Sequence, residues 1–198
     1  SGIRQSFTRR VVSKSPHSCS YSLEQCHGYH GICGQLRIIL GVMTLTLKTD
    51  YRGSIPLEVE GITPDITRGK SLADIERLPV FHGNKKTVLA EFFTVSGDAA
   101  DARIEWEGDL SRVHWIGAGM KEGAMCIHGP AGRHVGSRMC DGTIEVLGDV
   151  SDWVGAEMLG GLIHVHGSAG HLVGAAYRGS ALGMTGGTLL VQGTAGNE

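Results

Sequence analysis

Residues 143–167 read TIEVLGDVSDWVGAEMLGGLIHVHG, and this stretch decides the fold. It opens and closes with short segments of alternating character, residues 143–147 and 162–166, each followed by a glycine. Such alternation is typical of β-strands with one buried face. The interval from the start of the first segment to the start of the second is too short for a strand followed by a crossover helix. The stretch therefore predicts parallel strands that stack one on the next.

The same spacing recurs on both sides of this stretch. Apolar–glycine pairs follow one another at intervals of 19 residues, namely Ile116-Gly117, Val135-Gly136, Val154-Gly155 and Val173-Gly174. Met120, Met139, Met158 and Tyr177 recur in the same frame. A fixed period of about 20 residues is the signature of a solenoid. We therefore expect residues one such period apart, from Trp106 onward, to be neighbours in successive coils.

Each coil contributes one strand, at residues 103–107, 124–128, 143–147, 162–166 and 188–192. Two positions in every strand are apolar and two residues apart: Ile104 and Trp106, Met125 and Ile127, Ile144 and Val146, Ile163 and Val165, Leu189 and Val191. Because side chains alternate across a strand, these pairs all face inward. The sequence predicts an all-β fold, a right-handed parallel β-helix of about 19-residue coils, with glycine at its corners.

Glycine content divides the chain into three parts. Ten of the 31 glycines lie in residues 1–100 and the other twenty-one lie in residues 101–198, which we assign to the β-helix and expect to continue beyond Glu198. Residues 43–100 are predicted to form a small α+β cap, with strands at 44–48, 57–60, 80–81 and 87–95 and a helix at 71–78 capped by Ser71. Residues 1–42 are predicted to be a disordered leader or an over-extended reading of the gene upstream of Met43, with a transit or tag sequence as the alternative.

Composition excludes several classes of protein. The 198 residues carry 18 basic and 20 acidic side chains, so the chain lacks the positive charge of a nucleic-acid binder. No apolar stretch approaches the roughly 18 residues that span a bilayer, and no membrane partner is expected. The five cysteines form no C-x-x-C pair, which excludes an iron–sulfur or zinc-finger frame and indicates reduced thiols in the cytoplasm.

One coil carries an insertion. The interval from Gly167 to Gly193 exceeds one period by seven residues, and the extra residues fall within 177–184. Loops that interrupt a repeat frequently carry its specific contacts. We therefore predict a contact with a partner protein through Tyr177, Arg178, Gly179, Leu182 and Met184.

Two ladders of polar side chains follow from the repeat. Cys126, Glu145 and His164 share an outward column, and His128 and His166 lie in the neighbouring one. These side chains suit a metal, but an outward strand face is polar by default and the sequence identifies no supporting partner, so no metal site is assigned. In the leader, Cys19, Cys26 and Cys33 with His17, His27 and His30 are spaced unsuitably for a metal.

The second ladder joins His114, Arg133, Asp152 and His171, for which we expect pairing of opposite charges. Trp115 and Trp153 share a column with His134 between them, which indicates packing at a corner or, alternatively, a sugar platform. The column of methionines is expected to fill the core. No pair of carboxylates, phosphate loop or nucleophile elbow is placed well enough to name a reaction, so no catalytic or cofactor-binding residue is assigned.

Several motifs resemble the C subunit of formylmethanofuran dehydrogenase, including that of the bacterial formyltransferase/hydrolase complex. They are IGAGM at 116–120, VGAEM at 154–158, GAAYRG at 174–179 and GMTGG at 183–187, joined by ITPD at 62–65 and HGNKK at 82–86. The resemblance covers residues 43–198. The glycine repeat alone is shared with the C-terminal domain of the large subunit of glutamate synthase, whereas the residues at 62–86 and the insertion favour the formylmethanofuran family.

The resemblance implies a non-catalytic subunit that docks the catalytic subunits of a complex in one-carbon metabolism. It implies that a molybdenum or tungsten pterin, iron–sulfur clusters and amidohydrolase metals lie in other subunits, and that this subunit binds no cofactor. Alternative interpretations are a hexapeptide-type acyltransferase, which would need a period of 18, a carbohydrate-binding or carbohydrate-cleaving β-helix using Trp115 and Trp153, and the glutamate synthase domain itself.

Overall fold

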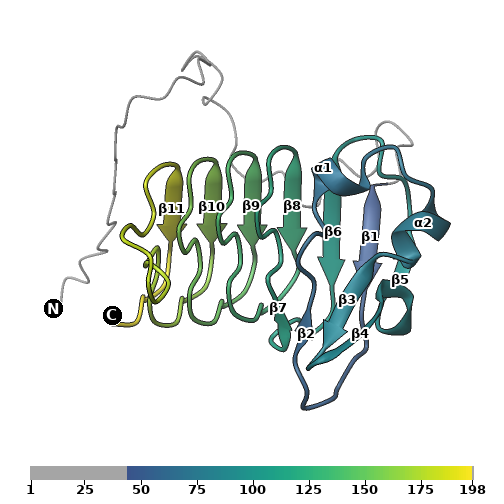
Figure 1. Ribbon diagram of the computed structural model, residues 1–198, viewed down its shortest axis with the longest axis horizontal. Coiled ribbons are helices and arrows are strands. Elements are labelled where there is room, and N and C mark those ends of the chain that lie inside the picture. Colours follow the sequence, from purple (N-terminus) through teal and green to yellow (C-terminus); the bar gives the residue numbers. More distant parts are fainter. Residues whose placement is uncertain (1–43, 198) are drawn as a thin grey trace, which may run out of the picture.

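The computed structural model describes residues 44–197 (Figure 1). The predicted leader, with Cys19, Cys26, Cys33 and its histidines, lies outside the described residues. Most regular structure in the described part is β-sheet, and its helices are short, so the predicted all-β class is confirmed. None of these helices has the length and apolar character needed to cross a bilayer.

The largest sheet contains seven strands in the order β11-β10-β9-β8-β6-β1-β5. Their bounds are β1 Leu45–Lys48, β5 Thr94–Ser96, β6 Arg103–Glu107, β8 Ala124–Ile127, β9 Thr143–Val146, β10 Leu162–Val165 and β11 Thr188–Val191. All neighbours are parallel except β1 and β5. The five predicted strands of the repeat are thus present, four of them ending one residue earlier than predicted.

The register of these strands brings the predicted inward pairs together. Ile104 pairs with Met125, which pairs with Ile144, and the same line continues to Ile163 and Leu189. The first four of these residues are at most 2% exposed. The sheet therefore buries one continuous apolar line, which contributes about 1.5–3 kcal/mol for each large side chain relative to its exposure.

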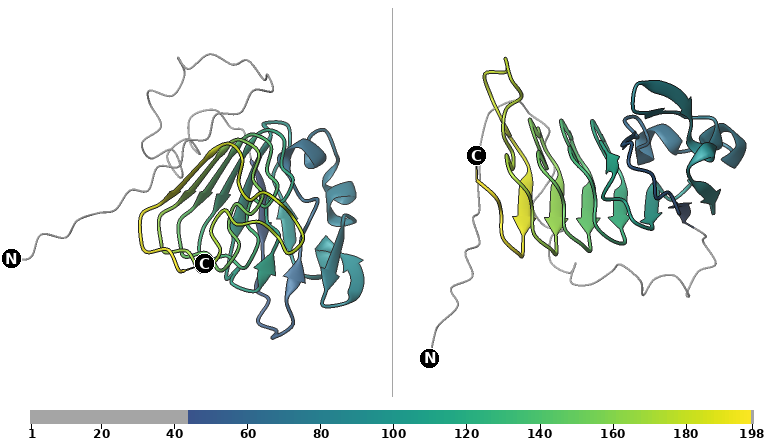
Figure 2. Two further views of the ribbon diagram at one scale, coloured as in Figure 1. Left: turned by 60° about the vertical axis from the view of Figure 1, so that its left-hand side comes forward. Right: turned by 90° about the horizontal axis from the view of Figure 1, so that it is seen from below.

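A second line of contacts joins the segments that connect the strands. Isolated parallel bridges join Leu110 to Ala131, Ala131 to Val150, Val150 to Ala169 and Ala169 to Ala195. At another corner the carbonyls of Met120, Met139 and Met158 accept from the amides of Cys140, Leu159 and Thr185, each at 2.8 Å. The three methionines are fully buried, as expected of core residues. Figure 2 shows the successive turns of the ribbon nested on one another.

Glycine at the second position of each apolar–glycine pair is required by packing. Gly117, Gly136 and Gly155 have φ of 72°, 64° and 63°. A Cβ on any of them would lie within 3.0 Å of a strand side chain, that of Ile144, Ile163 or Leu189 respectively. Close approach and left-handed backbone therefore coincide at this corner, which only glycine satisfies without strain.

Two departures from the strict period occur. Trp106 pairs with Ile127, so the first interval is two residues longer than the others, and the prediction of a constant period from Trp106 onward is wrong there. Met184 takes the place that Tyr177 was predicted to hold: its amide donates to Gly174 O at 2.7 Å, as the amide of Met158 donates to Gly155 O. The seven extra residues lie between Gly174 and Met184, and they move Tyr177 out of the methionine column.

The segment before β6 combines strands and short helices. A four-stranded sheet has the order β4-β3-β2-β7, with β2 at Leu57–Glu58, β3 at Pro79–His82, β4 at Lys85–Val88 and β7 at Val113–His114. The helices are α1 at Pro64–Thr67, α2 at Leu72–Glu76 and a 3-10 turn at Leu89–Glu91. Ser71 caps α2 by accepting from the Asp74 amide, as predicted.

This segment is more closely joined to the repeat than expected. Strand β1 pairs in parallel with β6, with Leu45 and Leu47 opposite Ile104 and Trp106, and so continues the apolar line of the large sheet. Strand β2 likewise pairs in parallel with β7. Both sheets are mixed, because β5 and the β3–β4 pair run antiparallel to their neighbours.

Candidate functional site

The insertion leaves the stack between Gly174 and Met184. In Figure 2 the connection before β11 reaches beyond the corners of the earlier coils. The loop is closed at its base by the bond from the Met184 amide to Gly174 O, and it turns where the Ser180 amide donates to Tyr177 O at 2.9 Å. A long loop with a closed base places its tip reproducibly at the surface.

Tyr177 points back onto the repeat. Its hydroxyl lies 2.8 Å from His134 Nδ1 and 2.6 Å from Ser137 Oγ. Its ring stacks on Trp153, with centroids 5.0 Å apart and planes 21° apart. Burial raises the pKa of this phenol above its usual value. Tyr177 therefore anchors the insertion to the preceding coils.

An ion pair flanks this anchor. Arg138 Nε donates to Glu157 Oε2 at 2.8 Å, and the Arg138 guanidinium lies 5.3 Å from the centre of the Tyr177 ring. Glu157 Oε1 also accepts the Tyr177 amide at 3.1 Å. The hydrogen bond from Arg138 lowers the pKa of Glu157. Glu157 thus holds the backbone of Tyr177, and Arg138 contacts its ring.

The remaining residues predicted to contact a partner divide by exposure. Arg178, Gly179 and Leu182 are exposed, and Leu182 is 66% exposed although it is a large apolar side chain. Met184 is half-buried and packs against the core cluster. The structure therefore gives Tyr177 and Met184 internal contacts and leaves Arg178 and Leu182 facing outward. The partner contact itself stays a prediction.

The aromatic column at the corner is as predicted. His134 stacks on Trp115 with centroids 4.1 Å apart, and Trp153 lies 6.1 Å beyond it. All three are half-buried and have left-handed φ near 65°, although none is glycine. Tyr177 covers the Trp153 face, so the column serves internal packing. Burial, with smaller contributions from His114 and Arg133, lowers the pKa of His134 to about 4, so the ring is neutral at pH 7.

The charge ladder is present in part. Arg133 Nε lies 3.3 Å from Asp152 Oδ2, which confirms the expected pairing of opposite charges. Asp152 Oδ1 accepts from the backbone amide of His171, at 2.9 Å, and the His171 ring donates from Nδ1 to Asn197 O. His114 has a lowered pKa because it is partly buried. This ladder fastens the coils together.

The outward column of the sheet carries the metal-compatible side chains. Cys126 pairs with Glu145, which pairs with His164. Cys126 is disulfide-bonded, so the expectation of reduced thiols is wrong for this cysteine. Two groups of ligand atoms each lie within 4.8 Å of one another: Glu145 with His164 and His166, and Glu105 with Cys126 and His128. The sequence does not reveal Glu105, because the longer first interval shifts it out of the frame, whereas it pairs directly with Cys126.

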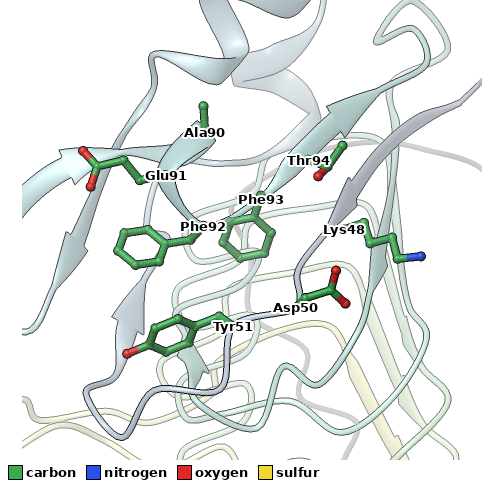
Figure 3. A pocket seen from close by; sticks show the side chains of 8 residues that line it. All are labelled: Lys48, Asp50, Tyr51, Ala90, Glu91, Phe92, Phe93 and Thr94. Atoms are coloured by element: carbon green, nitrogen blue, oxygen red, sulfur yellow. The ribbon is translucent and has the colours of Figure 1, made fainter.

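A shallow pocket lies beside the first strands. It has a volume of about 300 Å³ and is lined by Lys48, Asp50, Tyr51 and residues 90–94. Figure 3 shows the rings of Tyr51, Phe92 and Phe93 on one side and the charged ends of Lys48 and Asp50 on the other. The Tyr51 hydroxyl forms a hydrogen bond with His82 Nε2 at 2.9 Å, and His82 is not one of the residues that line the pocket. The sequence does not indicate this pocket, because its walls come from two segments that lie far apart along the chain.

These features define a class: a glycine-rich, mostly β protein whose largest sheet is built of parallel strands and whose insertion between Gly174 and Met184 is anchored by a tyrosine. No family model matches the sequence. Over 93 residues the chain is 47% identical to the C subunit of the molybdenum-containing formylmethanofuran dehydrogenase 1 of Methanothermobacter thermautotrophicus, a match covering 46% of this chain and 23% of the relative. Over 97 residues it is 40% identical to the C subunit of the tungsten-containing formylmethanofuran dehydrogenase 2 of Methanothermobacter wolfeii, covering 47% and 36%.

A solved structure agrees with these relatives. The formyltransferase/hydrolase complex (FhcABCD) from Methylorubrum extorquens, determined with methylofuran, contains a chain that matches this one with a TM-score of 0.71 and 27% identity, over 76% of this chain and 56% of that chain. The resemblance to the C subunit of formylmethanofuran dehydrogenase is therefore confirmed. The matched part spans about a quarter to a third of the length of the curated relatives.

Proposed function

We propose that this chain is a non-catalytic, structural subunit of a formylmethanofuran dehydrogenase or of its bacterial formyltransferase/hydrolase counterpart. The observation that carries the proposal is the 47% identity to a C subunit over 93 residues, together with the match to a chain of an assembled complex. Its role is to dock the catalytic subunits in one-carbon metabolism. The molybdenum or tungsten pterin, the iron–sulfur clusters and the amidohydrolase metals lie in those other subunits, and the complex is cytoplasmic.

We further propose that the repeat is a right-handed parallel β-helix. Its support is the unbroken parallel register from β1 to β11 and the second line of bridges from Leu110 to Ala195. A strand joined to the next parallel strand of one sheet is right-handed in nearly all known cases. In such a solenoid every side chain has a fixed place relative to its neighbours, which suits a rigid docking surface.

The tip of the insertion is the proposed contact. Arg178 and Leu182 are exposed on a loop whose base is fixed by Tyr177, so little ordering entropy is lost when a partner binds. Arginine is enriched among the residues that supply most of the binding energy of protein interfaces, and an exposed leucine adds apolar area that a partner can bury. Tyr177 and Met184 contribute by holding the loop in place.

Co-expression with the other subunits tests the docking role. We expect the complex to elute as one species, and the Arg178→Ala, Leu182→Ala double variant to bind at least about tenfold more weakly. The matched control is Arg112→Ala, Leu159→Ala, which removes an exposed arginine and a leucine that is 56% exposed from other positions. Elution of the wild-type chain at its own mass would refute the docking role. Equal weakening by both double variants would refute the assignment to the insertion.

A further inference from the structure

Strands β9 and β10 bring together two imidazoles and a carboxylate on the outward side of the large sheet. Glu145 on β9 is the register partner of His164 on β10. His166 follows His164 by two residues and so lies on the same face. Adjacent strands are about 4.8 Å apart, which allows side chains of this length to converge on one point.

The distances fit a small divalent ion. His166 Nε2 lies 2.8 Å from Glu145 Oε1, and the rings of His164 and His166 are 4.2 Å apart. One ligand atom from each of the three side chains lies within 4.8 Å of the other two. Tetrahedral zinc, bound at about 2.0 Å, separates its ligand atoms by about 3.3 Å. The separations in the structure, from 2.8 Å for His166 Nε2 and Glu145 Oε1 to at most 4.8 Å, bracket that value.

The surroundings restrict these side chains. All three are half-buried, and their backbones are fixed in a parallel ladder. Gln192, which follows β11, donates from Nε2 to His164 Nε2 at 2.9 Å. Interchange of the amide N and O of Gln192 keeps the same shape and lets Oε1 accept the Nε2 hydrogen of His164. In that tautomer Nδ1 is the unprotonated nitrogen, and the ring is oriented by a carbonyl as in many metal sites.

The geometry points to a zinc-class divalent metal site formed by Glu145, His164 and His166, with a coordination position left for water or another ligand. Two imidazoles and one carboxylate are ligand types that zinc and its first-row neighbours prefer. The sequence alone does not assign this site because it identifies no supporting partner; with its amide N and O interchanged, Gln192 supplies one. The metal site is independent of the docking role.

A similar group of side chains on β6 and β8 shows which feature is specific to the group on β9 and β10. Glu105, Cys126 and His128 occupy the corresponding positions, with a cysteine where the group on β9 and β10 has His164. Glu105 and His128 contact each other just as Glu145 and His166 do. We assign the metal to the group on β9 and β10 because it alone of the two offers two imidazoles.

Metal titration of the full chain tests the site. The chain is stripped with chelator and titrated with Zn²⁺ by calorimetry and with Co²⁺ by visible absorption. We expect one equivalent with ligand-field bands that lack thiolate-to-cobalt charge transfer. This equivalent should be lost in His164→Asn, His166→Asn and weakened at least about tenfold in Glu145→Gln, while Gln192→Leu weakens it less.

The leader supplies the matched control, since it contains histidines of its own. The variant His17→Asn, His27→Asn, His30→Asn is expected to keep the equivalent unchanged. Circular dichroism and urea unfolding in chelator establish that each variant is folded, and Glu145→Gln provides a conservative change should the double variant unfold. Unchanged Zn²⁺ stoichiometry and affinity in both Glu145→Gln and the histidine double variant, or loss of the equivalent in the leader variant, would overturn the assignment.

Discussion

The coil between β9 and β10 and the coil between β10 and β11 differ by seven residues but end in the same register. In the first, Gly155 and Met158 are joined by one backbone hydrogen bond with two residues between them. In the second, Gly174 and Met184 are joined by the same bond with nine residues between them. The strands and the glycine corner therefore fix the stack, whereas the segment between glycine and methionine is free to vary in length.

The largest expected effect comes from the glycine corner. Gly136→Ala should lower the free energy of unfolding by about 2–4 kcal/mol, because its Cβ would meet Ile163 and its φ is 64°. Gly179→Ala, in the insertion, should cost only about 1 kcal/mol, since its φ of 90° is strained but its Cβ would meet nothing within 4 Å. Urea unfolding of both variants measures the difference, and equal losses would show that the corner is no more constrained than the insertion.

The anchor of the insertion is expected to come next. Tyr177→Phe removes the hydroxyl that joins His134 and Ser137, and should cost about 1–2 kcal/mol because Ser137 is fully buried. Ser137→Ala removes the other partner, so a double-mutant cycle should give a non-additive result. Additive losses would show that the hydroxyls do not act together. Limited proteolysis after Arg178 should be faster in Tyr177→Phe than in the wild type.

A third prediction concerns pH. The pKa of His134 is lowered to about 4 in the folded state, whereas the unfolded ring titrates near 6.5. The unfolded state therefore binds the proton first, and stability should fall as pH decreases from about 6.5 toward 4. With allowance for solvent screening the loss is about 1 kcal/mol.

The variant His134→Asn tests this assignment, since asparagine tolerates the left-handed backbone at this corner. Urea midpoints at pH 7 and pH 5 should differ less in the variant than in the wild type. His114, whose pKa is also lowered by burial, contributes to the remaining slope. An unchanged slope would show that the His134 ring is not the titrating group.

The smallest effect is expected at the exposed ion pair beside the insertion. Arg138→Met removes the guanidinium, which bonds to Glu157 and lies over the Tyr177 ring, and keeps a side chain of similar length. The change in melting temperature should be smaller than for Tyr177→Phe and should vanish at high salt, because exposed pairs are screened. A loss larger than that of Tyr177→Phe would make the ion pair, and not the hydroxyl, the main anchor.

Much of the repeat could be predicted because its side chains recur in the linear sequence. The inward pairs such as Ile144 and Val146, the buried methionines and the column of Trp115, His134 and Trp153 follow from spacing alone. A periodic pattern reports a periodic backbone, because each position meets the same neighbours in every coil.

What could not be predicted depends on breaks in that period. The longer first interval moved Glu105 out of the predicted frame. The insertion led to the prediction of Tyr177 in the methionine column, at the position that Met184 occupies in the structure. The pairing of β1 with β6 was missed because the residues of β1 alternate without a flanking glycine. The pocket beside Tyr51 depends on contacts between distant segments, which a single sequence does not report.

The closure of the insertion by one bond from Met184 to Gly174 has a practical consequence. The chain accepts an insertion at that corner without changing the register of β10 and β11. The equivalent corner between Gly155 and Met158 presents the same backbone pair to a graft. Recognition sequences of other lengths could thus be inserted at these equivalent corners. Neighbouring insertions would lie one strand spacing apart.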